Sequence, residues 1–299
     1  MRDLHGLSAE AQTEIAGYIK RDNMQYVNSN ARPVKVKDTF YTRYGKRFID
    51  IIIAMFALTI AFPINLVIAI ITYFDVGRPI LFKQTRMGRD NRRFTIYKFR
   101  NMTNATDANG KLLPPSERVT KWGKFVRKTS LDELLNFVPV LTGSMSIIGP
   151  RPLPDNYIER LSERHKMVYA MRPGLECPPI HKIDHALNWQ DRFENYVWYV
   201  ENCSFWIDVK LMFRVLEVAF DHKSTAIRST ASNGGILGYS RDGNMLFTKA
   251  CPDKYVEEYC RNHGFSSLEE AIASRNKPGL NVRSSERLRK IEDEMAAAV

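Results

Sequence analysis

Residues 127–137, RKTSLDELLNF, bring two adjacent carboxylates close to a cation along the chain. The spacing Ser130-x-x-Glu133 is that of a helix capping box, which alone would explain both residues structurally. Asp132, however, falls in the first turn of the same predicted helix, and Arg127 lies just upstream. A helix N-terminus and an arginine both favour an ionised carboxylate. Such a carboxylate is suited to attack on phosphorus or to Mg²⁺ binding.

Basic side chains elsewhere could bind the phosphates of a substrate. The stretch 78–100 carries eight Lys and Arg residues, Lys98 and Arg100 among them, against one acidic residue, Asp90. Arg151 lies between two prolines, so its loop is stiff and its guanidinium is a good phosphate ligand. A solvated basic loop is the structural alternative for the stretch 78–100.

The whole chain of 299 residues is basic, with 44 Lys and Arg against 33 Asp and Glu and a formal net charge of +11. Such a charge suits nucleic acid, an anionic membrane surface or a phosphorylated substrate. The sequence contains no recognisable nucleic-acid module, so we expect no nucleic-acid partner. Four cysteines are too few for a disulfide scaffold in a chain of this length, which indicates a reducing, intracellular setting.

One run of 24 residues, 51–74, carries no charge at all. As a helix it would be roughly 36 Å long, enough to cross a ~30 Å hydrocarbon core. Pro63 lies in its middle, and basic residues flank it on both sides, whereas a spanning helix normally places them on one side. We therefore expect a re-entrant hairpin with legs 51–62 and 64–74. A kinked single span and a buried core helix are the alternatives.

The remaining pattern predicts short helices and small hairpins. The segment 80–102 reads as a β-hairpin turning at Gly88–Asn91, and a second hairpin turns at Asp242-Gly243. The segment 143–154 reads as a loop. Helices are expected at 8–20, 117–128, 130–142, 155–170, 188–222, 253–262, 267–274 and 285–298.

Together these stretches resemble the bacterial sugar transferases that act as monotopic phosphoglycosyl transferases. The resemblance covers about residues 40–222. It is carried by KRFID, the central Pro63, GRPILFKQTRMG, FTIYKFRNM, SLDELLNFVPVLTGSMSIIGPRPLPDNY and FENYVWYVENCSFWIDVKLM. So long an ordered series is more specific than any single motif, and it favours Asp132 and Glu133 as a catalytic pair over a simple cap.

The resemblance implies a mainly α fold with a small β-hairpin element, a re-entrant membrane helix hairpin and a cytoplasmic globular head at the bacterial inner membrane. It implies transfer of a phosphosugar from a nucleoside-diphosphate sugar, usually a UDP-sugar, to polyprenyl phosphate, with release of the nucleoside monophosphate. This would be the first membrane step of glycan or exopolysaccharide assembly. The implied divisions are an N-terminal helix and linker (1–40), the membrane segment (41–77), the catalytic domain (78–223) and an extension without assigned role (224–299).

The resemblance also implies roles for single residues. Asp132 would attack the phosphate next to the sugar and become covalently phosphoglycosylated, and Asp132 and Glu133 would hold Mg²⁺. The residues expected to bind substrate are Arg127, Arg151, Lys98, Arg100 and Asp184.

The chain departs from the family after Arg172-Pro173-Gly174, where LECPPIHKIDH replaces the usual Ile-Thr-Gly-Trp-Ala-Gln-Val and a following Gly-Arg. Asp184 stands where relatives have arginine, which favours a neutral or amino-bearing sugar. The altered segment motivates an alternative function, a non-catalytic homologue that serves as a membrane scaffold or binding subunit. A homodimer is kept as an alternative to a monomer.

Overall fold

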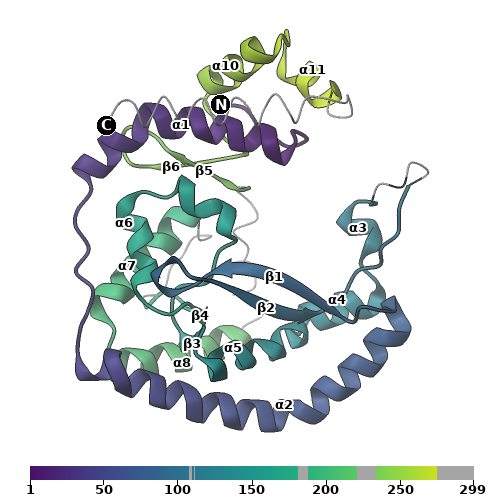
Figure 1. The fold of residues 1–299 in the computed structure, drawn as a ribbon, viewed down its shortest axis with the longest axis vertical. Helices are drawn as coiled ribbons and strands as arrows, with labels where there is room; N and C mark the ends of the chain where they lie inside the picture. The colour runs from purple at the N-terminus through teal and green to yellow at the C-terminus, as the bar shows by residue number, and fades with distance from the viewer. Residues whose placement is uncertain (108–109, 111, 181–187, 221–233, 275–299) are drawn as a thin grey trace.

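The computed structural model describes residues 1–107, 110, 112–180, 188–220 and 234–274, and its elements are shown in Figure 1. The helices and helical turns are α1 (Ala9–Asn30), η1 (Tyr41–Gly45), α2 (Lys46–Val76), η2 (Arg89–Asn91), α3 (Pro115–Arg118), α4 (Lys121–Lys128), η3 (Leu131–Asn136), α5 (Phe137–Thr142), η4 (Asp155–Arg160), α6 (Glu163–Lys166), η5 (Met167–Ala170), α7 (Trp189–Asn202), α8 (Phe205–Phe220), α10 (Asp253–His263) and α11 (Leu268–Ala273). The strands are β1 (Leu81–Met87), β2 (Arg93–Phe99), β3 (Ser146–Ile148), β4 (Gly174–Glu176), β5 (Ile236–Tyr239) and β6 (Met245–Phe247). The described chain is thus mainly helical with small two-stranded sheets, as the sequence predicts.

The apolar run forms one long helix, α2, of 31 residues. Figure 1 shows it as a curved helix along one edge of the head. The predicted hairpin with legs 51–62 and 64–74 is therefore wrong, because the helix continues through Pro63. Its buried residues recur every four or seven positions and form a single stripe. The alternative of a buried core helix is wrong, since large apolar side chains such as Phe56 and Phe62 are about 70% exposed, at 69% and 71%. Its length and composition are those of a membrane helix.

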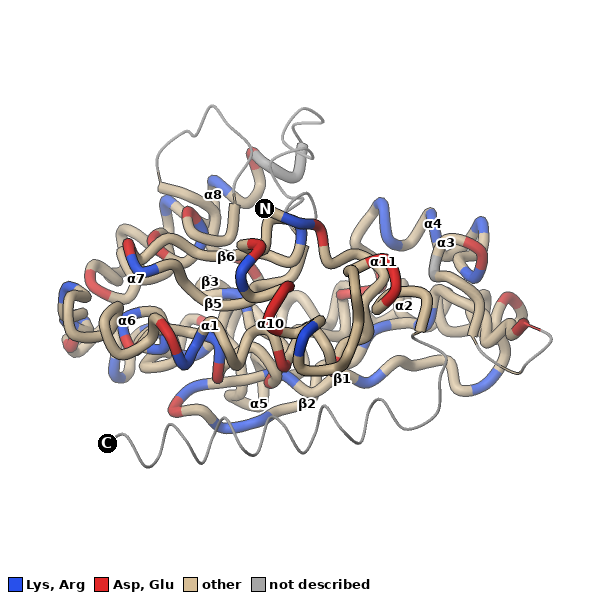
Figure 2. The backbone as a smooth tube through the Cα atoms, turned by 90° about the horizontal axis from the view of Figure 1, so that it is seen from above, with Lys and Arg blue, Asp and Glu red and all other residues tan. Residues whose placement is uncertain are grey.

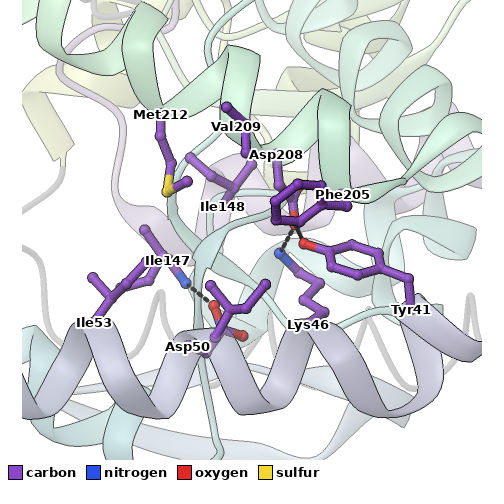
Figure 3. Close-up of a pocket in the computed structure, with 11 residues that line it drawn as sticks. Tyr41, Lys46, Asp50, Ile53, Ile147, Ile148, Phe205, Asp208, Val209 and Met212 are labelled. Atoms are coloured by element: carbon purple, nitrogen blue, oxygen red, sulfur yellow. Dashed lines mark hydrogen bonds and ion pairs between the residues drawn. The ribbon is translucent and has the colours of Figure 1, made fainter.

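Buried polar contacts fix the first turns of α2 to the head. Lys46 Nζ lies 2.7 Å from Asp208 of α8, and the Tyr41 hydroxyl donates to the same carboxylate at 2.5 Å. Figure 3 shows both side chains converging on Asp208. One turn later Asp50 accepts hydrogen bonds from the Ser146 hydroxyl and the Ile147 amide, both at 3.0 Å. Losing one partner of such a buried pair is costly because the other charge is left uncompensated.

The last turn of α2 is also attached to the head. Arg100, at the end of β2, donates to the carbonyl oxygens of residues 76 and 78. Thr120, the N-cap of α4, donates to Asp75 at 2.6 Å, and the Trp122 indole lies 3.2 Å from Thr72. Both ends of the membrane-capable helix therefore contact the same head.

Two small sheets organise the rest of the head. Strands β1 and β2 form the predicted hairpin, in which Leu81 pairs with Phe99 and Met87 with Arg93. Strand β3 lies within the predicted loop 143–154 and pairs in parallel with β4, which follows Pro173. Sequence periodicity misses both strands because three residues are too few to show alternation. This pairing brings the Arg151 loop beside Glu176.

The N-terminal helix and the C-terminal segment pack together. Helix α1, capped by Ser8 as predicted but longer than 8–20, contacts β5 and α10 around buried Ile15, Ile19 and Tyr255. Figure 1 shows α1 lying across the β5–β6 hairpin, on the side of the head opposite α2. The hairpin at Asp242-Gly243 is confirmed.

Several predicted helices are broken by caps. The predicted 117–128 divides into α3 and α4 at Thr120, and 188–222 divides into α7 and α8 between Asn202 and Phe205. The predicted 155–170 is a series of short turns. The predicted helices at 253–262 and 267–274 correspond to α10 and α11, and 285–298 lies outside the described residues.

Candidate active site

The Asp132–Glu133 pair lies at the start of the 3₁₀ turn η3, immediately before α5. The predicted capping box is wrong, because Ser130 adopts a left-handed conformation with φ 57° and its side chain makes no capping hydrogen bond. Only the backbone pairs, with the Glu133 amide donating to the Ser130 carbonyl at 3.2 Å. Neither carboxylate therefore takes part in a capping box at the start of η3.

Glu133 is held by two cations. Lys98 Nζ, from β2, lies 2.5 Å from its Oε1, and Arg151 Nη2 reaches the same oxygen at 3.4 Å. The side chains of Glu133 and Lys98 are 32% and 21% exposed, so this cluster is partly open to solvent. Burial alone would raise the pKa of Glu133, but Arg151 and Lys98 together hold it below its ordinary value. Glu133 is thus a carboxylate kept ionised by its neighbours.

Asp132 is more deeply buried, at 6% exposure, and Asn101 donates a hydrogen bond to its Oδ2 at 3.3 Å. Burial raises its pKa, the negative charge of Glu133 raises it further, and Lys98 and Arg127 offset this only in part. Arg127 and a backbone hydrogen bond lower the pKa of Asp132, as the sequence predicts, but burial and the like charge of Glu133 outweigh them and the net shift is upward.

The environments of the two carboxylates shift their pKa values in opposite directions. The pKa of Asp132 is raised and that of Glu133 is lowered, and such a difference allows two neighbouring acids to have different catalytic roles. Asp132 would be the stronger nucleophile once ionised, since basicity and nucleophilicity rise together. Glu133 orders Lys98 and Arg151, and such fixed cations can stabilise negative charge.

Arg151 connects Glu133 to a third carboxylate. Its Nη1 donates to Glu176 Oε2 at 3.3 Å, and its side chain is 41% exposed. Arg86 of β1 also faces this region, because the charges of Arg151 and Glu133 act on it. Its Nη1 donates to the Pro152 carbonyl at 3.3 Å. Arg86, Asn101 and Glu176 are additions that sequence reasoning missed. The basic stretch 78–100 contains Arg86, but only the β1–β2 register shows that it shares a face with Lys98.

Not every expected substrate ligand lies in this cluster. Lys98 and Arg151 contact Glu133 directly, and Arg127 acts on Asp132 through its charge. The Arg100 guanidinium is occupied by carbonyl oxygens at the end of α2, so the structure gives it an anchoring contact. Asp184 lies outside the described residues.

Among the described residues, no group of three or more His, Cys, Asp or Glu side chains is arranged to hold a metal ion. Asp132 and Glu133 nevertheless offer two neighbouring carboxylates. Mg²⁺ is commonly bound through one or two carboxylates, with water and substrate phosphates completing its shell. The carboxylate pair fits that kind of site and does not fit a cage made of protein ligands alone.

Comparison with known proteins identifies the family to which the chain is similar. The model of the family described as bacterial sugar transferase matches residues 41–222. An uncharacterized sugar transferase of Bacillus subtilis (strain 168) is 38% identical over 167 residues, covering 56% of this chain and 83% of the relative.

Two longer relatives have more specific names. A UDP-N-acetylgalactosamine-undecaprenyl-phosphate N-acetylgalactosaminephosphotransferase of Aeromonas hydrophila is 33% identical over 181 residues, covering 57% of this chain and 42% of the relative. A UDP-glucose:undecaprenyl-phosphate glucose-1-phosphate transferase of Klebsiella pneumoniae is 34% identical over 190 residues, covering 60% of this chain and 41% of the relative. The matched region thus spans about two fifths of these two proteins.

Proposed function

This chain belongs to the bacterial sugar transferase family, and on that premise we propose that it transfers a phosphosugar from a nucleoside-diphosphate sugar to polyprenyl phosphate. Relatives named as UDP-sugar:undecaprenyl-phosphate transferases support a UDP-sugar as donor and a polyprenyl phosphate as acceptor. The observation that carries the proposal is the buried Asp132 beside Glu133, which is itself held by Lys98 and Arg151. The product would begin a lipid-linked glycan.

The proposed mechanism has two displacements at phosphorus. The Asp132 carboxylate attacks the phosphorus that bears the sugar, a P–O bond forms, and the P–O bond to the nucleoside monophosphate breaks. The nucleotide leaves with that electron pair. A phosphate oxygen of polyprenyl phosphate then attacks the same phosphorus and releases the Asp132 carboxylate unchanged. Lys98, Arg151 and Arg127 would stabilise the charge that develops on the phosphoryl oxygens.

Mg²⁺ is part of the proposal. Asp132 and Glu133 would hold it together with substrate phosphates and water, and when bound it would neutralise phosphate charge. Lys98 and Arg151 keep Glu133 ionised, which is the form able to bind a cation. The protein itself therefore contributes a fixed pair of carboxylates with Lys98, Arg151 and Arg127 beside them.

We also propose a re-entrant placement, in which both ends of α2 stay at the cytoplasmic face of the bacterial inner membrane. Both helix ends contact the same head, and the residues facing away from the head are apolar and exposed. A helix of 31 residues is about 46 Å long, so its curved course along the head favours a shallow position in one leaflet.

The test is a turnover assay with protein in nanodiscs, polyprenyl phosphate, Mg²⁺ and a panel of nucleotide sugars. We expect release of nucleoside monophosphate that requires both substrates, with neutral or amino sugars preferred over acidic ones. Radiolabelled phosphosugar should remain on the protein when the acceptor is omitted. The absence of turnover with every donor would favour the scaffold or binding subunit, for which the altered segment after Gly174 is the motivation.

A further inference from the structure

Four arginines surround a cavity at the turn of the β1–β2 hairpin. Arg89, Arg92, Arg93 and Arg172 line an open space of about 440 Å³ together with the end of α5. We call this space the arginine cavity. Asp90 is the one acidic residue among those that line it. Figure 2 shows the blue segments along the β1–β2 hairpin.

The positive charge of the arginine cavity is only partly neutralised. Arg89 pairs with Asp90 at 3.4 Å and Arg93 with Asp155 at 3.3 Å. Within the described part of the chain, Arg92 and Arg172 form no ion pair. The Arg172 Nε donates to the Gly143 carbonyl at 3.1 Å, and burial and the charges of Arg47 and Arg89 lower its pKa. The cavity therefore carries an excess of cations, with Arg172 half-buried and the three arginines of the hairpin turn exposed.

The turn that carries Arg89, Arg92 and Arg93 is fixed by its own backbone. Asp90 and Asn91 adopt left-handed conformations with φ of 54° and 58°. The Gly88 amide donates to the Arg92 carbonyl at 2.8 Å, and a Cβ on Gly88 would lie 2.9 Å from that oxygen. A turn held in this way presents its guanidinium groups with little loss of backbone entropy on binding an anion.

The arginine cavity adjoins the beginning of the membrane-capable helix. Arg47, in the first turn of α2, donates to the carbonyls of Val140 and Leu141 in α5 and lies against Gly143, which lines the cavity. In the next turns of α2 the exposed side chains become apolar, and Phe48 is 66% exposed. The cavity thus lies where apolar surface gives way to charge, the depth at which lipid headgroups are found.

From this arrangement we propose that the arginine cavity binds the phosphate of an anionic phospholipid headgroup. Guanidinium groups recognise phosphate through paired, charge-assisted hydrogen bonds. Basic residues near an anionic leaflet are attracted to it by its negative surface potential. The site is separate from the Asp132–Glu133 pair, because Arg93 and Lys98 are five residues apart on β2, roughly 17 Å at strand spacing. A bound headgroup would fix the depth and orientation of the head on the membrane.

The test measures thermal unfolding of the full chain in detergent while short-chain lipids are added. Dihexanoyl phosphatidylglycerol is the probe, dihexanoyl phosphatidylcholine the uncharged comparison, and inorganic phosphate the soluble anion. We expect phosphatidylglycerol to raise the melting temperature by several degrees and the other two to leave it nearly unchanged. The readout is binding, so a chain without turnover would give the same result, and failure here is distinguishable from failure of the proposed reaction.

The variants are Arg92→Gln, which alters an exposed and unpaired side chain, and Arg92→Gln/Arg172→Gln. The matched control is Lys249→Gln/Arg261→Gln, which removes the same charge from exposed positions in the C-terminal segment. We expect the lipid-induced shift to fall by at least half in Arg92→Gln, to vanish in the double variant and to persist in the control. Equal shifts in all proteins, or equal shifts with phosphatidylcholine, would overturn the proposal. A full shift with inorganic phosphate would also overturn it, by showing a site for free anions.

Discussion

Glu176 accepts a hydrogen bond from Arg151 at 3.3 Å, on the guanidinium nitrogen that does not face Glu133. The arginine best placed to bind a substrate phosphate is thus already shared by two carboxylates. By the resemblance described above, Glu176 stands where the usual Ile-Thr-Gly-Trp segment has its threonine, so we expect the second carboxylate to be a departure from the family pattern. Under the proposed function, a donor diphosphate would compete with Glu176 for Arg151.

We predict that Glu176→Thr lowers the KM for the donor. Removing the competing carboxylate frees Arg151, and since a hydrogen bond to a charged group is worth roughly 1.5–3 kcal/mol before desolvation, an effect of about threefold to tenfold is reasonable. Steady-state kinetics over a donor series would measure it, with kcat expected to change little. Glu176→Gln removes the charge and keeps the size, so it should lower the KM as well if the negative charge is what competes for Arg151. A rise in KM would mean that Glu176 positions Arg151 for the phosphate instead.

Asp132→Asn should abolish turnover and leave the fold intact. The amide is not a nucleophile, so a loss of roughly 10⁴-fold or more is expected. Burial and the charge of Glu133 raise the pKa of Asp132, so its ionised form opposes folding at neutral pH and the neutral asparagine should melt at a slightly higher temperature. Circular dichroism melts together with nucleotide release would check both. Near-normal activity in this variant would contradict the covalent mechanism.

The acid side of the pH–rate profile should follow Asp132. Only the ionised carboxylate can attack phosphorus, so kcat should fall as the pH drops through a pKa that is higher than that of a free aspartate. Glu133→Gln removes the like charge that raises this pKa. Its residual activity should therefore persist to lower pH than that of the wild type, although its maximum is reduced. An unchanged acid limb would assign that limb to another group.

Ionised Glu133 stabilises the fold, whereas ionised Asp132 opposes folding, so their contributions to stability depend on pH in opposite ways. Arg151 and Lys98 hold its folded-state pKa below the ordinary value, so its contribution is present above the unfolded pKa and is lost as the pH falls through the folded one. In the absence of substrate we therefore expect Glu133→Gln to be less stable than wild type near neutral pH and to approach it at acid pH. Melting temperatures across a pH series would show whether the two curves converge.

Much of the fold is predictable because its signals are local. The β1–β2 hairpin, the Ser8 cap and the turn at Asp242-Gly243 all follow from residues adjacent in sequence. The course of the apolar segment does not, because Pro63 indicates a break between two legs and the structure has one continuous helix. The capping box failed for a tertiary reason. Lys98 and Arg151 hold the Glu133 side chain, which a cap would direct toward its own helix end.

The site was predictable in composition but not in its contacts. The carboxylate pair and Arg151 are visible in the sequence, but Asn101, Arg86 and Glu176 join them only through the β1–β2 register and the parallel β3–β4 pairing. Arg100 is the opposite case, because the sequence predicts a substrate ligand and the structure shows its guanidinium bound to the end of α2. The direction of the pKa shift at Asp132 depends on burial, which cannot be inferred from the neighbouring residues in the sequence.

The placement of α2 can be tested with single cysteines beside its two ends. Tyr44→Cys lies in the turn before the helix, where the native side chain is 63% exposed, and Ile80→Cys lies just after it. The four native cysteines are buried, so background labelling should be low. With both helix ends attached to one head, we expect a membrane-impermeant maleimide to label both positions from the same side of oriented vesicles. A cysteine at an exposed position far from α2, such as Lys249→Cys, shows on which side of the membrane the head lies, and we expect it to label from that same side. Labelling of positions 44 and 80 from opposite sides would establish a kinked span, and then the contacts of Asp75 with Thr120 and of Arg100 with the end of α2 could not all form in the membrane.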